Sequence, residues 1–294
     1  MNFDNSWNAV LKPGEATVFF DVLSNTKFEA DATSYSKINA WWLAELCRLI
    51  YRQGSDEASG AKPPTRRQIL DNVKLEEIEF FNEGDTEAGL VKTKSSADVQ
   101  FAALVLRGTN NLMDWLTDIR AIPAGWAGHG NVHKGFAKAL TLIWDKVSTS
   151  LDKNVPSDCP LFITGHSLGA ALATLAASLR PPRALYTFGS PRVGDKDFGE
   201  TLSGVKNFRV VNNRDAVTTV PPPLPFHHVG ELHYITHEGG MLTNPDDDTV
   251  ARDRLKRDRI SIFSGDLRRF FTDAPEPFAD HAPVNYVAHL ERQV

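Results

Sequence analysis

One short stretch of the chain combines a serine with a turn that could make its hydroxyl reactive. Ser167 lies between Gly165 and Gly169, after the apolar residues 161–163 and before the small-residue run 170–177. The first run is typical of a buried strand and the second of a helix. A G-x-S-x-G turn between them holds the serine in a strained conformation beside the first helical amides, and its glycines allow close approach. The pattern alone also arises by chance, but the order of strand, turn and helix predicts a catalytic serine.

A serine hydroxyl becomes a nucleophile when a base accepts its proton, and a carboxylate orients that base. Enzymes with this turn carry the acid and then the histidine after the serine along the chain. Asp215 follows the strand-like residues 207–212 in a polar turn, where the acid is expected. Asp195 is the alternative, but its position after a turn favours capping of the next helix. We therefore favour Asp215.

The histidine that would act as the base is expected near the C-terminus. His281 lies in a loop before the last predicted helix, from which it could reach Ser167 at the edge of the sheet. Its neighbour Asp280 cannot easily reach Nδ1 of the same imidazole. His289 is the alternative base, and His166 is expected to point to the far side of the turn. The remaining histidines after the serine lie in or beside a predicted strand, where packing and hydrogen-bonding roles are expected: His227, His228, His233 and His237.

Several collinear blocks together resemble the class 3 lipases, the α/β-hydrolase family of fungal triacylglycerol lipases and their bacterial relatives. The blocks extend over about residues 75–290 and comprise 106–109, 132–136, 165–171, 186–194, 209–215 and 280–281. The resemblance implies a triad of Ser167, Asp215 and His281, in agreement with the residues chosen above. It also implies an oxyanion hole made by Thr109 and by the backbone amide of Leu168.

The segment at about residues 110–120 is predicted to form an amphipathic helix. Its apolar side chains share one helical face: Leu112, Trp115, Leu116 and Ile119. This face could pack on the core as in any surface helix, but the resemblance implies a lid over the active site. Exposing four such side chains to water would cost up to about 6–12 kcal/mol. We therefore expect the lid to stay closed in water and to open at a lipid surface.

Strands that alternate with helices predict an α/β fold with a mostly parallel central sheet and helices on both faces. Because the chain has no repeat and no second apolar core, we expect residues 1–294 to form a single α/β-hydrolase domain. The main predicted helices are 35–53, which is amphipathic, 65–73 and 133–151. The predicted strands are 78–82, 89–93, 100–106, 184–188, 207–212 and 231–235.

The composition argues against several classes of protein. Lys and Arg number 32 against 37 Asp and Glu, a net charge of −5 that does not suggest a nucleic-acid partner. No apolar run approaches the roughly 20 residues of a transmembrane helix. The first residues lack the features of a secretory signal, so a cytoplasmic protein is expected, with a secreted mature form as the alternative. Cys47 and Cys159 are too few for a disulfide framework and are expected to be reduced, half-buried thiols.

A charged segment at about residues 244–275 is expected to be a solvated loop that runs into a surface helix. A calcium site on its three consecutive aspartates is the alternative, although nothing there resembles a complete metal loop: Asp246, Asp247 and Asp248. The histidines between residues 227 and 237 do not have the spacing of a zinc site. We expect no metal and no cofactor.

These features predict a serine carboxylester hydrolase that forms an acyl-enzyme and meets a lipid or ester substrate at a lipid–water interface. A triacylglycerol lipase is favoured because an apolar lid suits water-insoluble esters. A phospholipase A1, a short-chain esterase or an acyltransferase could use the same triad. A remote alternative is a binding module on a catalytically inactive hydrolase fold.

Overall fold

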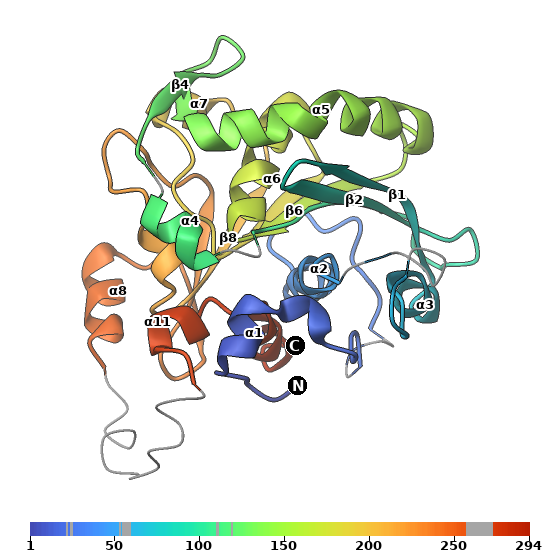
Figure 1. Cartoon of the computed structure of the whole chain (residues 1–294), viewed down its shortest axis with the longest axis horizontal. Helices are drawn as coiled ribbons and strands as arrows, with labels where there is room; N and C mark the ends of the chain where they lie inside the picture. The colour runs from blue at the N-terminus through green and yellow to red at the C-terminus, as the bar shows by residue number, and fades with distance from the viewer. Residues whose placement is uncertain are drawn as a thin grey trace.

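A sheet of eight strands runs through the middle of the molecule (Figure 1). The computed structural model describes residues 1–21, 23, 26–52, 54, 60–109, 112–118, 120–256 and 273–294. Along the sheet the strands are β1 (Leu75–Glu83), β2 (Thr86–Thr93), β3 (Ala102–Leu106), β6 (Leu161–His166), β7 (Ala184–Phe188), β8 (Asn207–Asn212), β9 (Glu231–Ile235) and β10 (Met241–Thr243).

The five central strands, from β3 through β6, β7 and β8 to β9, pair in parallel, whereas β1, β2 and β10 add antiparallel edges. Every residue of β3, β6 and β7 is buried. Strands that are apolar on both faces must be covered on both faces, which is why their sequences read as continuous apolar runs. The predicted mostly parallel sheet is confirmed. The strands predicted at 184–188, 207–212 and 231–235 have those bounds in the structure.

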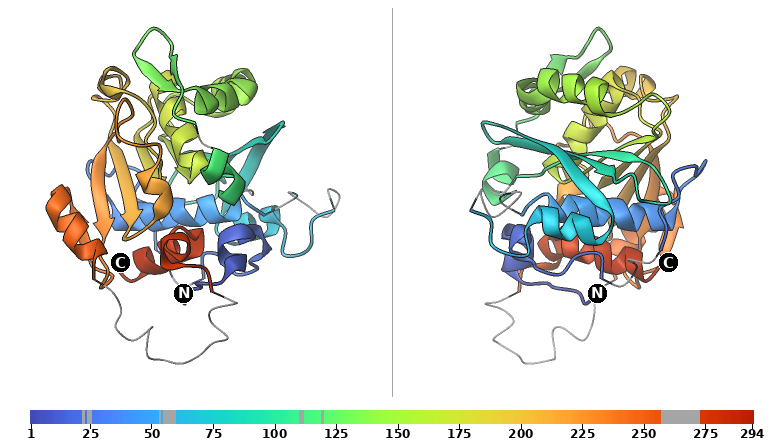
Figure 2. Two further views of the ribbon diagram at one scale, coloured as in Figure 1. Left: turned by 60° about the vertical axis from the view of Figure 1, so that its left-hand side comes forward. Right: turned by 90° about the vertical axis from the view of Figure 1, so that its right-hand side faces the viewer.

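Helices cover both faces of the sheet (Figure 1, Figure 2). One face carries α5 (Lys134–Asn154) and α6 (Leu168–Leu179), and the other carries α2 (Lys37–Leu49) and α12 (Pro283–Glu291). Alternation along β6 supplies both cores, because Phe162 packs in the cluster of α2 and α12, and Ile163 packs in the cluster of α5 and α6.

Helix α2 differs from the amphipathic helix predicted over residues 35–53. It is shorter, and its residues from Asn39 to Leu49 are all buried, since α12 lies against its outer side. Its two buried charged residues have internal partners: Arg48 Nε donates to Glu45 Oε2 at 2.8 Å, and Glu45 Oε1 accepts from Phe20 N at 3.0 Å. The polar residues from Asn39 onward are therefore buried in the protein and do not form a solvent-exposed face. Cys47, on the same helix, is buried, and only Cys159 is a half-buried thiol as expected.

The remaining elements are short. They are α1 (Trp7–Leu11), η1 (Pro13–Glu15), α3 (Arg66–Asn72), α4 (Leu112–Asp118), α7 (Lys196–Glu200), η3 (Ala216–Thr219), α8 (Asp247–Arg254), α11 (Glu276–Ala279) and the separate β4 (Pro123–Gly125) and β5 (Asn131–His133) pair. Helix α3 agrees with the predicted 65–73 helix and begins with a capping box of Thr65 and Gln68.

The described part of the charged segment forms the expected surface helix, α8. Asp246 caps it by accepting a hydrogen bond from Thr249 N at 2.6 Å, so this carboxylate serves the helix. Residues 257–272 of the segment lie outside the described residues. Within the described ranges, no group of three or more His, Cys, Asp or Glu side chains is arranged to hold a metal ion. The described helices also include none that is long and apolar enough to cross a membrane.

Candidate active site

Ser167 occupies a sharp turn between β6 and α6. Its backbone has φ 61° and ψ −130°, a left-handed conformation that is strained for a non-glycine residue. Glycine is required on both sides: a Cβ at Gly165 would lie 2.2 Å from the carbonyl oxygen of Gly169, and one at Gly169 would lie 2.1 Å from the carbonyl oxygen of Leu106. The strained strand-to-helix turn expected from the sequence is confirmed.

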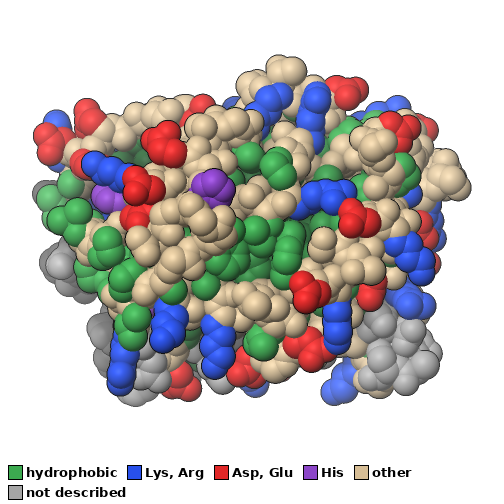
Figure 3. All heavy atoms as spheres, turned by 90° about the horizontal axis from the view of Figure 1, so that it is seen from above, with side chains coloured by type: hydrophobic (Ala, Val, Ile, Leu, Met, Phe, Trp, Pro, Cys, Tyr) green, Lys and Arg blue, Asp and Glu red, His purple; other side chains and the backbone are tan. Residues whose placement is uncertain are grey.

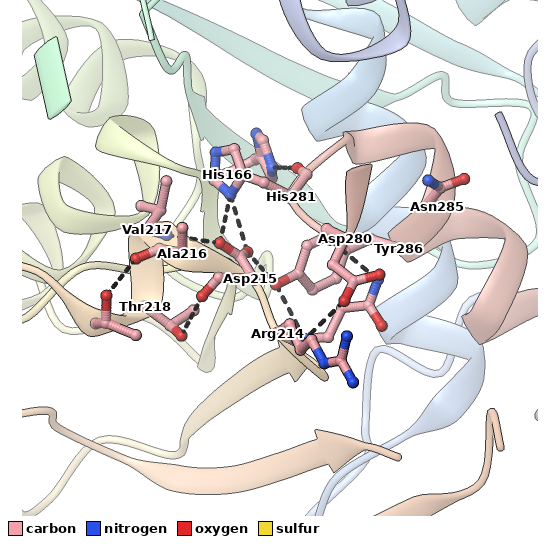
Figure 4. Close-up of polar contacts among 12 residues, drawn as sticks. His166, Arg214, Asp215, Ala216, Val217, Thr218, Asp280, His281, Asn285 and Tyr286 are labelled. Carbon is pink, nitrogen blue, oxygen red and sulfur yellow. Dashed lines mark hydrogen bonds and ion pairs between the residues drawn. The ribbon is translucent and has the colours of Figure 1, made fainter. Parts of the chain in front are cut away.

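Asp215 follows β8 and begins the turn η3, where its Oδ1 accepts a hydrogen bond from Val217 N at 2.9 Å. Its carboxylate is fully buried and contacts Nδ1 of His281 at 2.9 and 2.8 Å, and Tyr286 Oη donates to Oδ2 at 2.6 Å (Figure 4). Burial by itself favours the neutral acid, but the adjacent His281 and these hydrogen bonds outweigh it and lower the pKa of Asp215. The carboxylate is therefore ionised at neutral pH.

His281 lies between α11 and α12, and its Nδ1 is hydrogen-bonded to the carboxylate of Asp215. The structure does not form the hydrogen bond from Ser167 to His281: Ser167 Oγ and His281 Nε2 are both buried, and neither has a partner within the described part of the chain. Such bonds are often long in enzymes without substrate and tighten in the reacting complex. Both side chains are 2% exposed, so the two atoms are also shielded from water.

Gly189 joins the neighbourhood of the serine to that of the acid and the histidine. Ser167 N donates to the carbonyl oxygen of Phe188 at 3.0 Å. A Cβ on Gly189, the next residue, would lie 2.6 Å from Asp215 Oδ2 and 3.0 Å from His281 Nδ1. Its φ of 60° also favours glycine. Sequence reasoning missed its role, although it lies in the 186–194 block.

The alternative acid and the neighbouring acid have other partners. Asp195 Oδ1 accepts from Phe198 N at 2.9 Å and caps α7, as predicted. Asp280 Oδ2 accepts from Arg214 N at 3.0 Å, and burial raises the pKa of Asp280 to about 6. Neither carboxylate has a hydrogen bond to His281 among those of the described residues.

The other histidines also have structural partners. His228 Nε2 bonds to the carbonyl oxygen of Thr218 at 2.9 Å, and His233 Nε2 contacts Glu231 Oε1 at 2.7 Å. Burial lowers the pKa of His289 to about 4, and its ring packs 4.5 Å from that of Phe3.

His166 has no side-chain hydrogen bond to Ser167 within the described residues, as expected of a residue that is not its base, but it lies against His281, which the sequence did not predict. Its ring centroid lies 4.5 Å from that of His281, and its Nε2 bonds to the His281 carbonyl oxygen at 2.7 Å. Alternation along β6 places His166 on the same face as Phe162, towards α2 and α12, and the loop before α12 returns across that face. Sequence spacing carries no signal for this contact, and none for Tyr286.

Of the two residues expected to form an oxyanion hole, Leu168 follows the serine directly in the chain, and Thr109 follows Gly108, which packs against the serine turn. Gly108 packs against the turn so closely that a Cβ on it would lie 3.1 Å from Ser167 Cβ, which brings the following residue, Thr109, to the same place. Helix α6 begins at Leu168, and the first amides of a helix have no acceptor within it.

Helix α4 lies over the segments that carry the acid and the histidine. Leu112 is buried, while Trp115 and Leu116 are half-buried, and all three pack in a cluster with Val217, Ala279, Ala282 and the α1 residues Ala9 and Val10. Val217 lies two residues after Asp215, and Ala282 follows His281 directly. Ile119, the fourth residue expected on this face, lies outside the described residues.

Comparison with known proteins decides the family. A profile of the family described as lipase (class 3) matches residues 103–224. A solved structure described as "A serine protease triad forms the catalytic centre of a triacylglycerol lipase" is 31% identical, with a TM-score of 0.52, over 59% of this chain and 71% of that chain. The chain belongs to the class 3 lipase family. The resemblance inferred from the sequence is confirmed, and with it the α/β-hydrolase fold.

Two curated relatives of this class 3 lipase family member differ in the activity that their names state. "Lipase" of Rhizomucor miehei is 34% identical over 169 residues, covering 52% of this chain and 46% of that protein. "Phospholipase A(1) DAD1, chloroplastic" of Arabidopsis thaliana is 33% identical over 144 residues, covering 39% of this chain and 32% of that protein. The chain thus matches less than half the length of these two relatives.

Proposed function

We propose that this class 3 lipase family member hydrolyses carboxylic esters, with Ser167 as nucleophile, His281 as general base and Asp215 as the acid that orients it. The observation that carries the proposal is the buried pair of Asp215 and His281, 2.8–2.9 Å apart, beside a serine held at a strained strand-to-helix turn. A buried carboxylate that holds one imidazole nitrogen leaves the other free to accept a proton.

In the proposed reaction, Ser167 Oγ attacks the acyl carbon while His281 Nε2 takes the hydroxyl proton. The amides at Thr109 and Leu168 donate to the oxyanion of the tetrahedral intermediate. Collapse of this intermediate breaks the bond to the alcohol, which leaves with the proton from His281, and the acyl group stays on Ser167. Water then attacks the acyl carbon with His281 again as base, which releases the acid and restores the serine.

The substrate we propose is a lipid ester met at a lipid–water interface. Ser167 is 2% exposed, so a substrate reaches it only when a covering segment moves, and α4 is the segment we infer to be the lid. The exposed apolar side chains include Ile122, which follows α4 in the chain, at 45%, and Leu224 at 77%. On the face seen from above in Figure 3, apolar side chains gather near the centre and charged side chains lie mostly around them. Among lipid esters we propose a triacylglycerol, because an apolar lid suits water-insoluble esters.

A phospholipase A1 is the second candidate, because the relatives include a protein named as one. Both reactions use the same triad and differ in the leaving alcohol. Incubation with an emulsion that mixes triacylglycerol and phosphatidylcholine separates them by which substrate is consumed first. Preferential release of lysophospholipid would replace the triacylglycerol lipase proposal with the phospholipase.

The decisive test of the triad compares the natural chain with Ser167→Ala. Turnover is expected to fall by about 10⁴- to 10⁶-fold while the variant stays folded. A fluorophosphonate probe should label the natural chain and not the variant, because only an activated serine reacts. A folded Ser167→Ala protein that keeps its hydrolysis would refute the assignment. Absence of labelling in the natural chain, with and without lipid, would favour the inactive binding module. The cytoplasmic location expected from the sequence stays a prediction.

A further inference from the structure

His166 is buried directly before the proposed nucleophile, and the reaction above gives it no role. Both of its ring nitrogens have partners. Nε2 lies 2.7 Å from the carbonyl oxygen of His281, and Nδ1 lies 3.1 Å from Oη of Tyr51, which follows α2. Each contact joins residues 115 positions apart in the chain. The imidazole therefore bridges two distant segments at the site.

The direction of these hydrogen bonds follows from the chemistry of the partners. A carbonyl oxygen only accepts, so Nε2 of His166 carries the proton. Burial and the neighbouring His281 lower the pKa of His166 to about 3, so the ring is neutral and holds a single proton at neutral pH. Nδ1 is then an acceptor, and Tyr51 Oη must donate to it.

Tyr51 extends these contacts to the third segment of the site. Its hydroxyl packs against the backbone of Gly108, the residue before Thr109. A Cβ on Gly108 would lie 2.1 Å from Tyr51 Oη, so only glycine admits the hydroxyl there. Tyr51 therefore touches Gly108 and donates to His166, and His166 donates to the backbone of His281.

We propose that Tyr51 and His166 are positioning residues that set the spacing of three backbones: the oxyanion segment at Gly108, the nucleophile turn and the loop of the general base. This inference rests on the function proposed above, since it assigns those segments their roles. Asp215 holds the side chain of His281, whereas His166 holds its main chain, so the base is fixed from both ends. Small displacements of reacting groups are costly, because about 1 Å of misplacement can reduce a rate by about 10²-fold.

A neutral histidine suits this position for a definite reason. The bridge needs a donor on one side and an acceptor on the other, held at a fixed separation by a rigid group. A neutral imidazole offers both at once, whereas lysine and arginine only donate and a carboxylate only accepts. If Tyr51 lost its hydroxyl, Nδ1 of His166 would be buried without a donor, and the ring would be held only through Nε2–H and the carbonyl oxygen of His281.

The kinetic test compares Tyr51→Phe with Tyr35→Phe, each of which deletes one buried hydroxyl. Tyr35 Oη has no hydrogen-bond partner in the described ranges, so its loss removes no bond and the variant serves as the matched control. With a soluble p-nitrophenyl ester, we expect Tyr51→Phe to lower kcat by about 10- to 100-fold and to change KM less than about twofold. Tyr35→Phe should keep both constants. Equal kcat values for the two folded variants would overturn the proposal.

A second comparison uses His166→Gln and His166→Leu. The glutamine amide can donate to the His281 carbonyl and accept from Tyr51, so it should recover part of the kcat that leucine loses. Equal loss in both variants, with both folded, would count against a hydrogen-bonded bridge.

A third measurement does not depend on activity. Nitrogen-15 NMR of histidine-labelled natural protein should find His166 as the neutral Nε2–H tautomer between about pH 5 and 8. An Nδ1–H tautomer, or a ring that becomes charged in this range, would overturn the proposal even if the variants failed to fold. If Ser167→Ala abolishes turnover but Tyr51→Phe does not reduce it, only this inference fails. If Ser167→Ala keeps its turnover, the proposed function fails.

Discussion

At the scale of single residues, the acid of the site is governed by two opposing effects. Burial raises the pKa of Asp215, while the adjacent imidazole of His281 and the hydrogen bonds from His281 and Tyr286 lower it further than burial raises it. The folded-state pKa is therefore below the unfolded value of about 3.9. The resulting stabilisation is present above the unfolded pKa and is lost as the pH falls through the folded pKa.

We expect Tyr286→Phe to reduce both stability and turnover. The phenol donates to the ionised Asp215 at 2.6 Å, and a hydrogen bond to a charged group contributes about 1.5–3 kcal/mol. The free energy of unfolding should fall by about this amount at pH 7. The difference from the natural chain should shrink at a pH low enough to protonate Asp215 in the folded protein. Urea unfolding of the variant and of the natural chain, at pH 7 and at that lower pH, measures these differences in the free energy of unfolding.

Tyr234→Phe is the matched control for this prediction. Tyr234 also donates to a buried aspartate, Asp253, at 3.0 Å, but neither residue has a hydrogen bond to Asp215 or His281 in the described part of the chain. It should lose stability and keep its kcat, whereas Tyr286→Phe should lose both. If Tyr286→Phe had the kcat of the natural chain, Tyr286 would have only a structural role.

At the scale of elements, we expect the contact of α4 with the segment after Asp215 and the segment before α12 to control how the site opens. Leu116 is half-buried in this contact, which we call the α4 seam. Replacing Leu116 with alanine should therefore destabilise the closed position of α4 by about 1–2 kcal/mol. A change of this size alters an equilibrium by about 5- to 30-fold. In water without lipid, we expect Leu116→Ala to be labelled by a fluorophosphonate faster than the natural chain by about this factor.

Leu142→Ala provides the control, because Leu142 is 50% exposed on α5 and makes no seam with α4. Its labelling rate should equal that of the natural chain. The lid assignment would be abandoned if Leu116→Ala and Leu142→Ala were labelled at the same rate.

At the scale of the whole molecule, a buried nucleophile beneath an apolar seam predicts that activity depends on the physical state of the substrate. In water the apolar face of α4 stays covered, but acyl chains at a lipid surface solvate it and remove most of the cost of opening. The specific activity on tributyrin should therefore rise above the solubility limit of this ester. Rates measured across that limit test this, and a specific activity that stays constant would contradict it.

The identity of the proposed nucleophile, acid and base was predictable from the sequence because each rests on local pattern or chain order. The glycines around Ser167 mark a turn whose geometry depends only on neighbouring residues, and the apolar strands and amphipathic helices predict the α/β class. Asp215 and His281 follow from their positions after strands and in a late loop. The bounds of α2 were harder to predict, because its polar residues pair inside the protein.

The partners of these residues were decided only by the tertiary structure. Tyr286 and Asp215 are 71 positions apart, and the contacts of His166 with Tyr51 and with His281 each span 115. No periodicity connects residues at such separations, because their meeting depends on how strand ends and returning loops pack in three dimensions. The sequence determined which side chains could do the chemistry. The packing of α2, β6 and the loop before α12 determined what holds them in place.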